Sequence, residues 1–497
     1  MMYVSTRGGC EPVSSAEAIK IGLAGDGGLF VPDELPELDE EVLEDLCSAP
    51  YCERVAKILH MFLCDSFTIE ELLECARAAY PGEKFPGGAA PVVALGDRLR
   101  VLELWHGPTA AFKDMALQIM PHLLRLAVRK TGEQGKVLIL AATSGDTGKA
   151  ALEGYRDVDG TKIMVFYPAG GVSRVQMLQM ATQEGSNVSV QAVRGNFDDT
   201  QAGVKRIFAS PEIKAELAKR GYILTSANSI NWGRLAPQIA YYVSAYCDLI
   251  RSGDIKLGEE IYVCVPTGNF GNILAAYIAR RMGLPIRRLI CASNSNRVLT
   301  DFFENGVYDR NREFHLTISP SMDILISSNL ERLLWFAAGP NETARYMRQL
   351  AETGRYEVDP SVLEEIGRDF VGMSCSEDET RAEIKSIWKH FGYLCDTHTA
   401  VGLHCAEQYL EGETRRTNGR KMLAVSTASA YKFASDVYYA LTGEVVEGTA
   451  AIGQLSSYTG TSVHASLVGI EQRNIRFDPQ SAIEADDMDG AVLSFAV

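Results

Sequence analysis

Apolar residues in the first part of the chain recur at helical spacing. This pattern extends from residue 40 to residue 75, with a break near Pro50. A short strand at 2–5 and a helix at 15–23 are predicted before it. An apolar period of about 3.6 residues is typical of helices that bury one face. The sequence therefore predicts a helical N-terminal domain, which we place at residues 1–95.

From about Pro91 the pattern changes to short apolar, β-rich runs that alternate with helices. The predicted strands lie at 136–142, 162–167, 188–193, 261–265, 288–292 and 421–426. Such alternation is typical of an α/β fold with open, mostly parallel sheets and flanking helices. We expect two α/β domains, a smaller one at 136–235 and a larger one made of 96–135 and 236–497, which includes an acidic helical insertion at 341–372.

Composition places the chain among globular proteins. Its 497 residues are 46% hydrophobic and 23% charged, which suits two or three domains with sizeable cores. The formal net charge of −16 repels nucleic acid and anionic membrane surfaces. We therefore expect a small-molecule partner, no nucleic acid and no membrane, and an anionic substrate would need a local basic pocket. The sequence does not indicate an oligomeric state.

The cysteines and the N-terminal segment indicate a cellular compartment. The eleven cysteines are scattered and contain no CxxC pair, which favours reduced thiols over disulfides or a zinc site. Residues 1–27 lack the basic and apolar regions of a secretory signal, and no run approaches the roughly 20 apolar residues of a membrane span. These features predict a cytoplasmic enzyme.

One lysine stands in a setting that suits covalent chemistry. Lys113 follows a Gly107-Pro108 turn and a short apolar run, and a helical pattern begins near Asp114. Apolar surroundings lower the pKa of an amine and prepare it for Schiff-base formation. The ordinary alternative is an exposed lysine in the first turn of a helix, which is the commoner case for any single lysine.

Two loops that follow predicted strands are suited to binding anions. The loop at 143–148 lies between the strand at 136–142 and a helix, so several free backbone N–H groups point to one place. An ordinary helix cap explains the same residues equally well. The loop at 266–272 has Gly268 and Gly271, which leave room for a phosphate beside the backbone, but it lacks the GxGxxG spacing of a dinucleotide site.

Polar residues at two further helix starts allow more than one interpretation. Asn231 and Arg234 lie at a helix entrance, where an arginine can bind a phosphate with two hydrogen bonds, although turns and solvated arginines also have this composition. Asp396 and His398 lie close together before a helix that carries His404, and this pair suggests a metal or acid–base site. No third ligand has metal spacing, so we expect no metal there and a helix capped by Thr397 or Thr399 instead.

Several of these phrases resemble the threonine synthases, pyridoxal-phosphate enzymes of the tryptophan-synthase-beta fold type (fold type II). They are His-Gly-Pro-Thr-Ala-Ala-Phe-Lys-Asp at 106–114, Ser-Gly-Asp-Thr-Gly at 144–148 and Gly-Asn-Phe-Gly-Asn at 268–272. The openings Tyr-Val-Ser-Thr-Arg-Gly and Gly-Leu-Ala-Gly-Asp-Gly-Gly-Leu-Phe-Val-Pro are also similar to the N-terminus of the longer members. The resemblance extends to about Phe433.

The resemblance implies roles for individual residues. Lys113 would carry pyridoxal 5'-phosphate, and Asp146 stands where related enzymes often place an asparagine beside the phenolic oxygen of the cofactor. Thr427 would face the pyridine nitrogen, although many members continue with His-Pro-Ala-Lys-Phe where this chain has Ser-Ala-Tyr-Lys-Phe. The implied cofactor-phosphate residues are Gly268, Asn269, Phe270, Gly271 and Asn272. The implied substrate-binding residues are Ser144, Thr147, Asn231 and Arg234.

The activity that the resemblance implies is a lyase reaction. The enzyme would convert O-phospho-L-homoserine and water to L-threonine and phosphate, the last step of threonine biosynthesis, with Lys113 moving protons between carbons. Two alternatives stay open. One is a phospho-lyase that releases 2-oxobutanoate, ammonia and phosphate, and the other is a protein that binds the cofactor without turnover.

Overall fold

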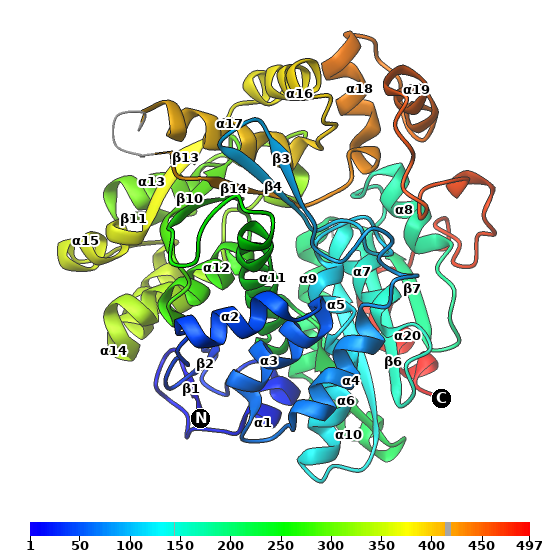
Figure 1. Cartoon of the computed structure of the whole chain (residues 1–497). Coiled ribbons are helices and arrows are strands. Elements are labelled where there is room, and N and C mark those ends of the chain that lie inside the picture. Colours follow the sequence, from blue (N-terminus) through cyan, green and yellow to red (C-terminus); the bar gives the residue numbers. More distant parts are fainter. Residues whose placement is uncertain (144, 413–418) are drawn as a thin grey trace.

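The chain folds into two open sheets with helices on their faces and a helical segment at the N-terminus (Figure 1). The computed structural model describes residues 1–143, 145–412 and 419–497. The predicted α/β class with mostly parallel sheets is confirmed. No helix of these described residues is both long enough and apolar enough to cross a membrane.

The N-terminal segment is a small antiparallel pair followed by short helices. β1 (Tyr3–Ser5) pairs with β2 (Phe30–Pro32). The helices are α1 (Ser15–Ile21), α2 (Glu40–Ser48), α3 (Tyr51–Leu63) and α4 (Ile69–Ala79). Pro50 separates α2 from α3 as predicted. Its backbone is extended, so it does not continue α2, and it is the N-cap residue of α3.

The larger sheet has six strands, of which only the last is antiparallel to its neighbour. In spatial order the strands are β13 (Phe370–Ser374), β10 (Ile286–Ser293), β9 (Ile261–Pro266), β14 (Met422–Ser426), β4 (Leu99–Glu103) and β3 (Val92–Leu95). β9, β14 and β4 are adjacent and parallel, so the chain leaves all three at the same edge of the sheet. Ligands of open α/β sheets bind at such carboxyl edges.

The smaller sheet is entirely parallel. Its strands, in spatial order, are β7 (Val188–Val193), β6 (Thr161–Pro168), β5 (Lys136–Ala142) and β8 (Tyr222–Ser226). The helices that follow these strands are α7 (Asp146–Tyr155), α8 (Arg174–Ala181), α9 (Phe197–Ala209), α10 (Pro211–Lys219) and α11 (Trp232–Arg251). α11 is almost wholly buried and packs against α12 (Gly271–Met282) and α3, so it joins the smaller sheet to the rest of the chain.

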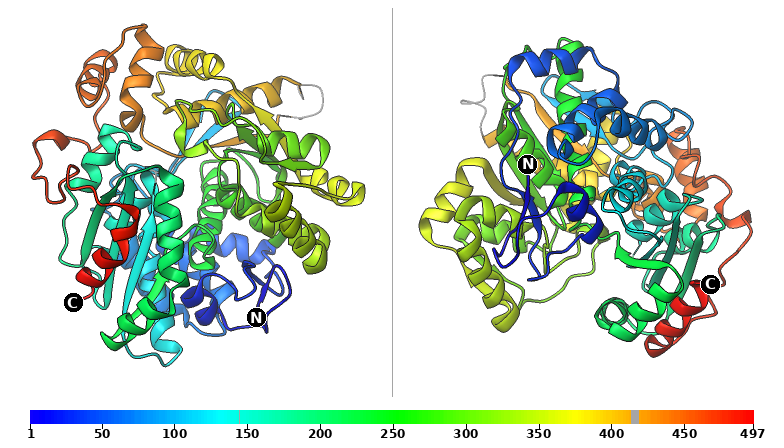
Figure 2. Two further views of the ribbon diagram at one scale, coloured as in Figure 1. Left: turned by 180° about the vertical axis from the view of Figure 1, so that it is seen from behind. Right: turned by 90° about the horizontal axis from the view of Figure 1, so that it is seen from below.

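The C-terminal tail packs against the smaller sheet. Met488 and Val492 of α20 (Met488–Phe495) share an apolar cluster with Leu138, and Ile483 forms a parallel bridge with Val193 (Figure 2). We predicted that this tail belongs to the larger domain, whereas its apolar side chains pack against the smaller sheet. Most acidic residues of the tail are exposed.

The segment 341–372 is only partly helical. It spans most of α14 (Leu330–Thr353), then β12 (Arg355–Glu357) and α15 (Pro360–Asp369), and it ends inside β13. The prediction of a helical insertion is therefore wrong at its end, because β13 pairs in parallel with β10 and forms the edge of the larger sheet. β13 is a short edge strand, Phe-Val-Gly-Met-Ser, and an apolar run of this length cannot be told from a helical segment by periodicity.

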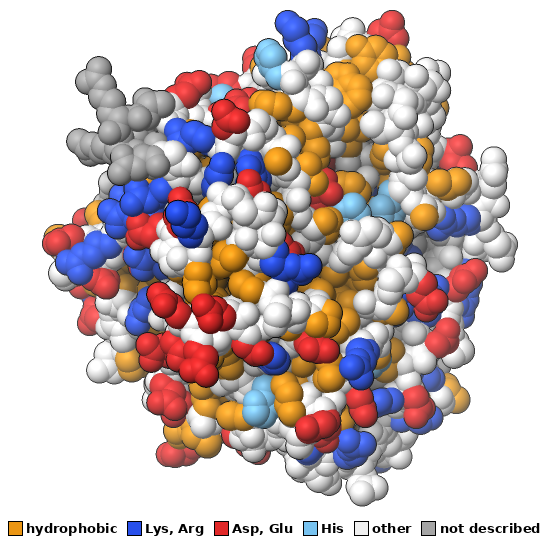
Figure 3. Space-filling model, viewed as in Figure 1, with side chains coloured by type: hydrophobic (Ala, Val, Ile, Leu, Met, Phe, Trp, Pro, Cys, Tyr) orange, Lys and Arg blue, Asp and Glu red, His pale blue; other side chains and the backbone are white. Residues whose placement is uncertain are grey.

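The remaining elements cover the sheets. The helices are α5 (Asp114–Leu117), α6 (Met120–Lys130), α13 (Val298–Asn305), α16 (Glu377–Phe391), α17 (Thr397–Gly412), α18 (Ala434–Thr442) and α19 (Ala450–Thr459). β11 (Val307–Asp309) pairs with β12, and a short 3-10 helix, η2, spans Ala430–Phe433. Acidic and basic side chains both occur across the face shown in Figure 3.

Candidate active site

Three segments meet at the carboxyl edge of the larger sheet. Lys113 lies in the connection after β4, Gly268 follows β9, and Thr427 follows β14. Because these strands are adjacent and parallel, the fold brings the three predicted segments to one edge. The backbone N–H of Phe112 donates to the carbonyl oxygen of Thr427 over 2.8 Å, which joins the lysine segment directly to the end of β14.

Lys113 is a half-buried amine with a perturbed pKa. It precedes α5, and its Nζ lies 5.0 Å from the ring centre of Phe112. Burial lowers the pKa of Lys113 to about 8, with the positive charges of Lys432 and Arg234 acting in the same direction and the Asp146 carboxylate opposing them. About one tenth of such amines is unprotonated at pH 7, far more than for an ordinary lysine, and the unprotonated form attacks a carbonyl.

The turn before Lys113 is fixed by a buried carboxyl group. Asp114 accepts hydrogen bonds from the backbone N–H and the hydroxyl of Thr109, both at 2.8 Å. Burial raises the pKa of Asp114 to about 7. A Cβ atom on Gly107 would lie 2.6 Å from Asp114 Oδ2, so only glycine fits this close approach. The conformation of the segment that presents Lys113 is thus set by its own side chains.

Asp146 begins α7 at the carboxyl end of β5 and faces the larger sheet. Its Oδ1 lies 2.7 Å from Nζ of Lys432 and accepts a hydrogen bond of 3.0 Å from Nε2 of Gln176. Burial by itself would raise the pKa of Asp146, but the charges of Lys432 and Lys113 hold it well below its usual range. Asp146 is therefore a buried anion between two lysines.

Lys432 and Gln176 were not predicted as site residues. Nζ of Lys432 also donates to the carbonyl oxygen of Thr109 over 3.0 Å, so this side chain links the turn before Lys113 to α7. Lys432 is 3% exposed, although it lies in η2 among apolar residues. A lysine inside the apolar phrase Ala-Tyr-Lys-Phe was the available signal, since buried lysines are almost always paired.

The loop from Gly268 to Asn272 leads into the N-terminus of α12. Phe270 has a left-handed backbone with φ 63°, and a Cβ atom on Gly268 would lie 2.7 Å from the carbonyl oxygen of Ser321. The Asn272 carboxamide oxygen accepts a hydrogen bond of 2.6 Å from the Tyr242 hydroxyl, while its buried Nδ2 has no protein partner. The loop thus combines a helix N-terminus with an unused N–H donor, which suits a phosphate.

Asn231 and Arg234 lie at the start of α11 and differ in what they offer. Asn231 caps the helix through the Gly233 N–H and donates to the carbonyl oxygen of Ile19, both at 2.8 Å, so its side chain positions α11. Arg234 is 4% exposed, and one of its Nη atoms donates to the Ala227 carbonyl oxygen. Its Nε has no protein partner, and burial lowers the pKa of Arg234 to about 10.

A second unpartnered group accompanies Arg234. The hydroxyl of Tyr155, the last residue of α7, is buried without a hydrogen-bond partner, and it influences the pKa of Arg234. Thr147 is half-buried in the first turn of the same helix, next to Asp146. Ser144 lies outside the described residues. A buried guanidinium and a buried hydroxyl without partners are expensive unless an anion or water binds them.

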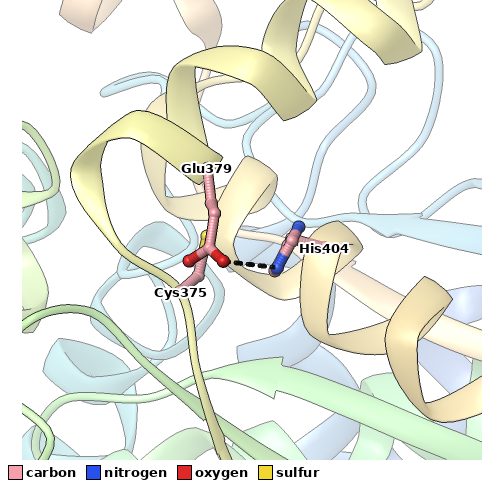
Figure 4. Close-up of side chains that lie close together, drawn as sticks. All are labelled: Cys375, Glu379 and His404. Carbon is pink, nitrogen blue, oxygen red and sulfur yellow. Dashed lines mark ion pairs between the residues drawn. The ribbon is translucent and has the colours of Figure 1, made fainter.

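The segment after Cys395 was predicted to hold no metal and to cap its helix with Thr397 or Thr399. The Asp396 carboxylate, and neither Thr397 nor Thr399, accepts hydrogen bonds at the N-terminus of α17, from the backbone N–H groups of His398 and Thr399. His404 instead lies beside two potential ligands from other segments, which the sequence spacing did not indicate. Donor atoms of Cys375, Glu379 and His404 all lie within 4.8 Å of one another (Figure 4).

Pyridoxal 5'-phosphate matches the groups that meet at this edge. Lys113 supplies an amine with a pKa near 8, Asn272 and Arg234 supply N–H donors that no protein group uses, and α12 supplies a helix N-terminus. The buried donors would otherwise remain unsatisfied. The donor set therefore fits a ligand that carries both an aldehyde and a phosphate.

Family models match most of the chain. The model described as "Threonine synthase N terminus" matches residues 2–80, and the model described as "Pyridoxal-phosphate dependent enzyme" matches residues 90–427. The second match contains Lys113, Asp146, Arg234 and Thr427.

Named relatives and solved structures agree with these models. "Threonine synthase-like 1" of Homo sapiens is 41% identical over 461 residues, which cover 88% of this chain and 60% of the relative. "Threonine synthase" of Schizosaccharomyces pombe is 37% identical and covers 88% of this chain and 89% of the relative. The chain thus spans about three fifths of the length of the threonine synthase-like 1 relatives of human and Macaca fascicularis.

Two crystal structures are similar over nearly the whole chain. PLP-bound threonine synthase from Brucella melitensis superposes with a TM-score of 0.88 at 34% identity, and covers 100% of this chain and 99% of that chain. Threonine synthase from yeast superposes with a TM-score of 0.88 at 32% identity, and covers 99% and 98%. The fold and the order of the segments that form the site are therefore shared.

Proposed function

The chain belongs to the threonine synthase family of pyridoxal-phosphate-dependent enzymes, and on this premise we propose that it converts O-phospho-L-homoserine and water to L-threonine and phosphate. One observation carries the proposal. An amine with a pKa near 8, Lys113, shares its site with Arg234, a buried guanidinium that lacks an acidic partner. The first group suits covalent amino-acid chemistry, and the second suits a phosphate monoester.

Residues from both sheets would hold the cofactor. Its phosphate fits the loop from Gly268 to Asn272 at the N-terminus of α12, and its aldehyde fits Lys113. The Thr427 backbone bonds to the lysine segment, the Asp146 carboxylate interacts with Lys113, and both residues would set the polarity around the ring. When bound, pyridoxal phosphate withdraws electrons from the carbon skeleton of an amino acid.

Lys113 has the properties of a proton carrier. Its Nζ, once unprotonated, would take the proton from Cα of the substrate, release it within the site, and then take one from Cβ. It would return one proton to Cγ after phosphate leaves and one to Cα after water adds at Cβ, and the remaining proton of the water would leave with phosphate. A base works best when its pKa lies near the working pH, and a pKa of about 8 meets that condition. Lys432 and Asp146 would hold the surrounding charge constant while Nζ gains and loses protons.

Arg234 and the first turn of α7 would receive the substrate phosphate. Arg234 comes from the start of α11 and Thr147 from α7, and Ser144 would add a hydroxyl from the connection before α7. Phosphate retained by these groups could orient the water that adds at Cβ. Retention would favour threonine over 2-oxobutanoate, because the unsaturated intermediate then stays in the site until water adds.

The phospho-lyase is kept as a second candidate because of one observation. The chain is 41% identical to proteins named threonine synthase-like 1 and 35–37% identical to the threonine synthases of two yeasts and Pseudomonas aeruginosa. A cofactor-binding protein without turnover is the third candidate, and the intact Lys113 argues against it. The cytoplasm remains the predicted location.

Product analysis distinguishes the three candidates. The protein, purified with pyridoxal phosphate, is incubated with O-phospho-L-homoserine, and threonine, 2-oxobutanoate, ammonia and phosphate are quantified. Equal amounts of threonine and phosphate support the synthase. Equal amounts of 2-oxobutanoate, ammonia and phosphate would identify the lyase, and no phosphate release would leave only cofactor binding.

A further inference from the structure

A cluster of potential metal ligands lies at the edge of the larger sheet, away from Lys113. Cys375 directly follows β13, Glu379 and Glu383 lie one turn apart on α16, and His404 lies on α17. Figure 4 shows the side chains of Cys375, Glu379 and His404 turned toward one another between these elements. Their donor atoms, a thiol sulfur, a carboxylate oxygen and an imidazole nitrogen, all lie within 4.8 Å of one another.

The contacts around His404 are too long for hydrogen bonds. Its Nε2 lies 3.9 Å from Oε1 of Glu379, and its Nδ1 lies 3.7 Å from Oε2 of Glu383. Hydrogen bonds between such atoms are about 2.7–3.2 Å long. Glu379 Oε1 and His404 Nε2 therefore have the spacing of two ligands that share an ion, and the Glu383 carboxylate lies at the other ring nitrogen.

One buried carboxylate oxygen in the cluster has no partner. Glu383 is 7% exposed, and its Oε1 accepts no hydrogen bond. A buried carboxylate without a partner is strongly unfavourable, so the site needs a cation or a proton. This observation is independent of the distances among the other three side chains.

The charge of the cluster is unbalanced. The carboxylates of Glu379 and Glu383 lie 3.9 Å and 3.7 Å from the two ring nitrogens of His404. Two carboxylates therefore face a single imidazole, and an additional positive charge would relieve their repulsion.

The cluster is separate from the candidate active site. β10, β9 and β14 lie between β13, where the cluster begins, and β4, which leads to Lys113. At a strand spacing of about 4.8 Å, β13 and β4 are roughly 19 Å apart. A ligand of the cluster therefore does not touch the reacting atoms, and its role would be structural.

We propose that Cys375, Glu379 and His404 form a site for one Zn²⁺ ion that ties α16 and α17 to the end of β13, with the buried Glu383 carboxylate beside it. Sulfur, imidazole and carboxylate ligands are the combination that Zn²⁺ accepts in four-coordinate sites, whereas Mg²⁺ and Ca²⁺ prefer oxygen alone. As the ion binds, the Cys375 thiol loses its proton to solvent and the sulfur bonds to the metal.

The present contacts leave these ligand atoms available. Oε2 of Glu379 accepts hydrogen bonds from the N–H and hydroxyl of Ser376 in the capping box of α16, which leaves Oε1 directed toward His404. Cys375 Sγ contacts the Thr380 hydroxyl at 3.3 Å, a weak bond that metal binding can replace. These three protein ligands and one water would complete a four-coordinate site.

Zinc titration of the full-length protein tests the proposal. The cofactor-loaded protein is first dialysed against a chelator and is then titrated with Zn²⁺ in competition with a chromophoric chelator. We expect one equivalent to bind, and we expect Cys375→Ser and His404→Gln each to weaken binding at least tenfold. Glu379→Gln, which keeps the capping box, should weaken it as well. The matched controls Cys64→Ser and His390→Gln, both exposed and outside the cluster, should bind as the parent does.

Cobalt spectroscopy supplies a second measurement that does not depend on the variants folding. Co²⁺ bound with a thiolate ligand should give a near-ultraviolet charge-transfer band in difference spectra of the parent protein, and Cys375→Ser should lose it. Absence of the band in the parent protein, or stoichiometric Zn²⁺ binding that persists in Cys375→Ser and His404→Gln, would overturn the proposal. In either case protons alone would neutralise the cluster.

Discussion

Lys432 Nζ and Asp146 Oδ1 form a buried ion pair of 2.7 Å across the two sheets. Lys432 comes from the segment after β14 of the larger sheet, and Asp146 begins α7 after β5 of the smaller sheet. Both influence the pKa of Lys113, in opposite directions. The pair therefore joins the two halves of the candidate site and sets the electrostatic environment of its amine.

The first prediction concerns the amine itself. Lys113→Ala should abolish phosphate release from O-phospho-L-homoserine, because the other amine of the site, Lys432, is held by Asp146 and the carbonyl oxygen of Thr109. The variant should keep its fold and some cofactor affinity, since the loop from Gly268 to Asn272 is separate. Borohydride reduction followed by mass spectrometry should find no cofactor attached to the chain. Lys205→Ala, an exposed control, should behave as the parent does, and appreciable turnover by Lys113→Ala would remove Lys113 from its assigned role.

The second prediction is a pair of pH shifts with opposite signs. The rate at which the apoprotein attaches pyridoxal phosphate should rise with pH and be half-maximal near pH 8, because only the unprotonated Lys113 amine reacts. Asp146→Asn removes a charge that raises the pKa of Lys113, so the profile should move to lower pH. Lys432→Gln removes a charge that lowers it, so the profile should move to higher pH.

Stopped-flow absorbance across a pH series measures these rates. A purely structural role of the ion pair would slow both variants without separating their midpoints. Shifts in the same direction would contradict the charge assignment.

Parts of the fold were predictable because they depend on local pattern. β5 and β7 have the predicted bounds, since an apolar run between polar loops defines a buried strand. Lys432 was missed because its burial depends on Asp146, which is distant in sequence, and no local pattern records that contact. For Asn231 the sequence indicated a ligand contact that its side chain does not need. Its amide oxygen caps α11 and its amide nitrogen donates to the carbonyl oxygen of Ile19.

The third prediction separates cofactor binding from folding at two glycines. Gly271→Val should weaken cofactor binding at least tenfold, because its side chain would occupy the space where a phosphate approaches the N-terminus of α12. Its Cβ would meet nothing closer than Asn329 Nδ2 at 3.4 Å, so the apoprotein should lose no more than about 1 kcal/mol of stability. Titration with pyridoxal phosphate and urea unfolding of the apoprotein measure the two effects.

Gly268→Ala provides the contrasting case. Its Cβ would lie 2.7 Å from the carbonyl oxygen of Ser321, so this smaller change should destabilise the apoprotein more than Gly271→Val does. Unchanged cofactor affinity in Gly271→Val would mean that the loop is only a turn.

The last prediction concerns the choice between synthase and lyase. Arg234→Leu removes the buried guanidinium whose Nε has no protein partner, and we expect it to weaken substrate binding by about 2 to 5 kcal/mol, the range for losing a buried charge-assisted contact. Phosphate would then leave the site before water adds at Cβ. The ratio of 2-oxobutanoate to threonine should therefore rise, which is measured by product analysis at saturating substrate.

A second buried arginine shows whether that effect is specific. Arg54 is 2% exposed, donates to the Leu46 carbonyl oxygen at 2.8 Å and pairs with Asp248 at 2.7 Å among the N-terminal helices. Arg54→Leu removes a satisfied cation, so it should lower the melting temperature without changing the product ratio. Arg234→Leu should change the product ratio without lowering the melting temperature. Among the residues that the structure describes, the Arg234 charge has no acidic partner, so it is available to a phosphate. Normal substrate affinity with an unaltered threonine yield in Arg234→Leu would place Arg234 outside the phosphate site, and the unpartnered Nε would then require a bound water.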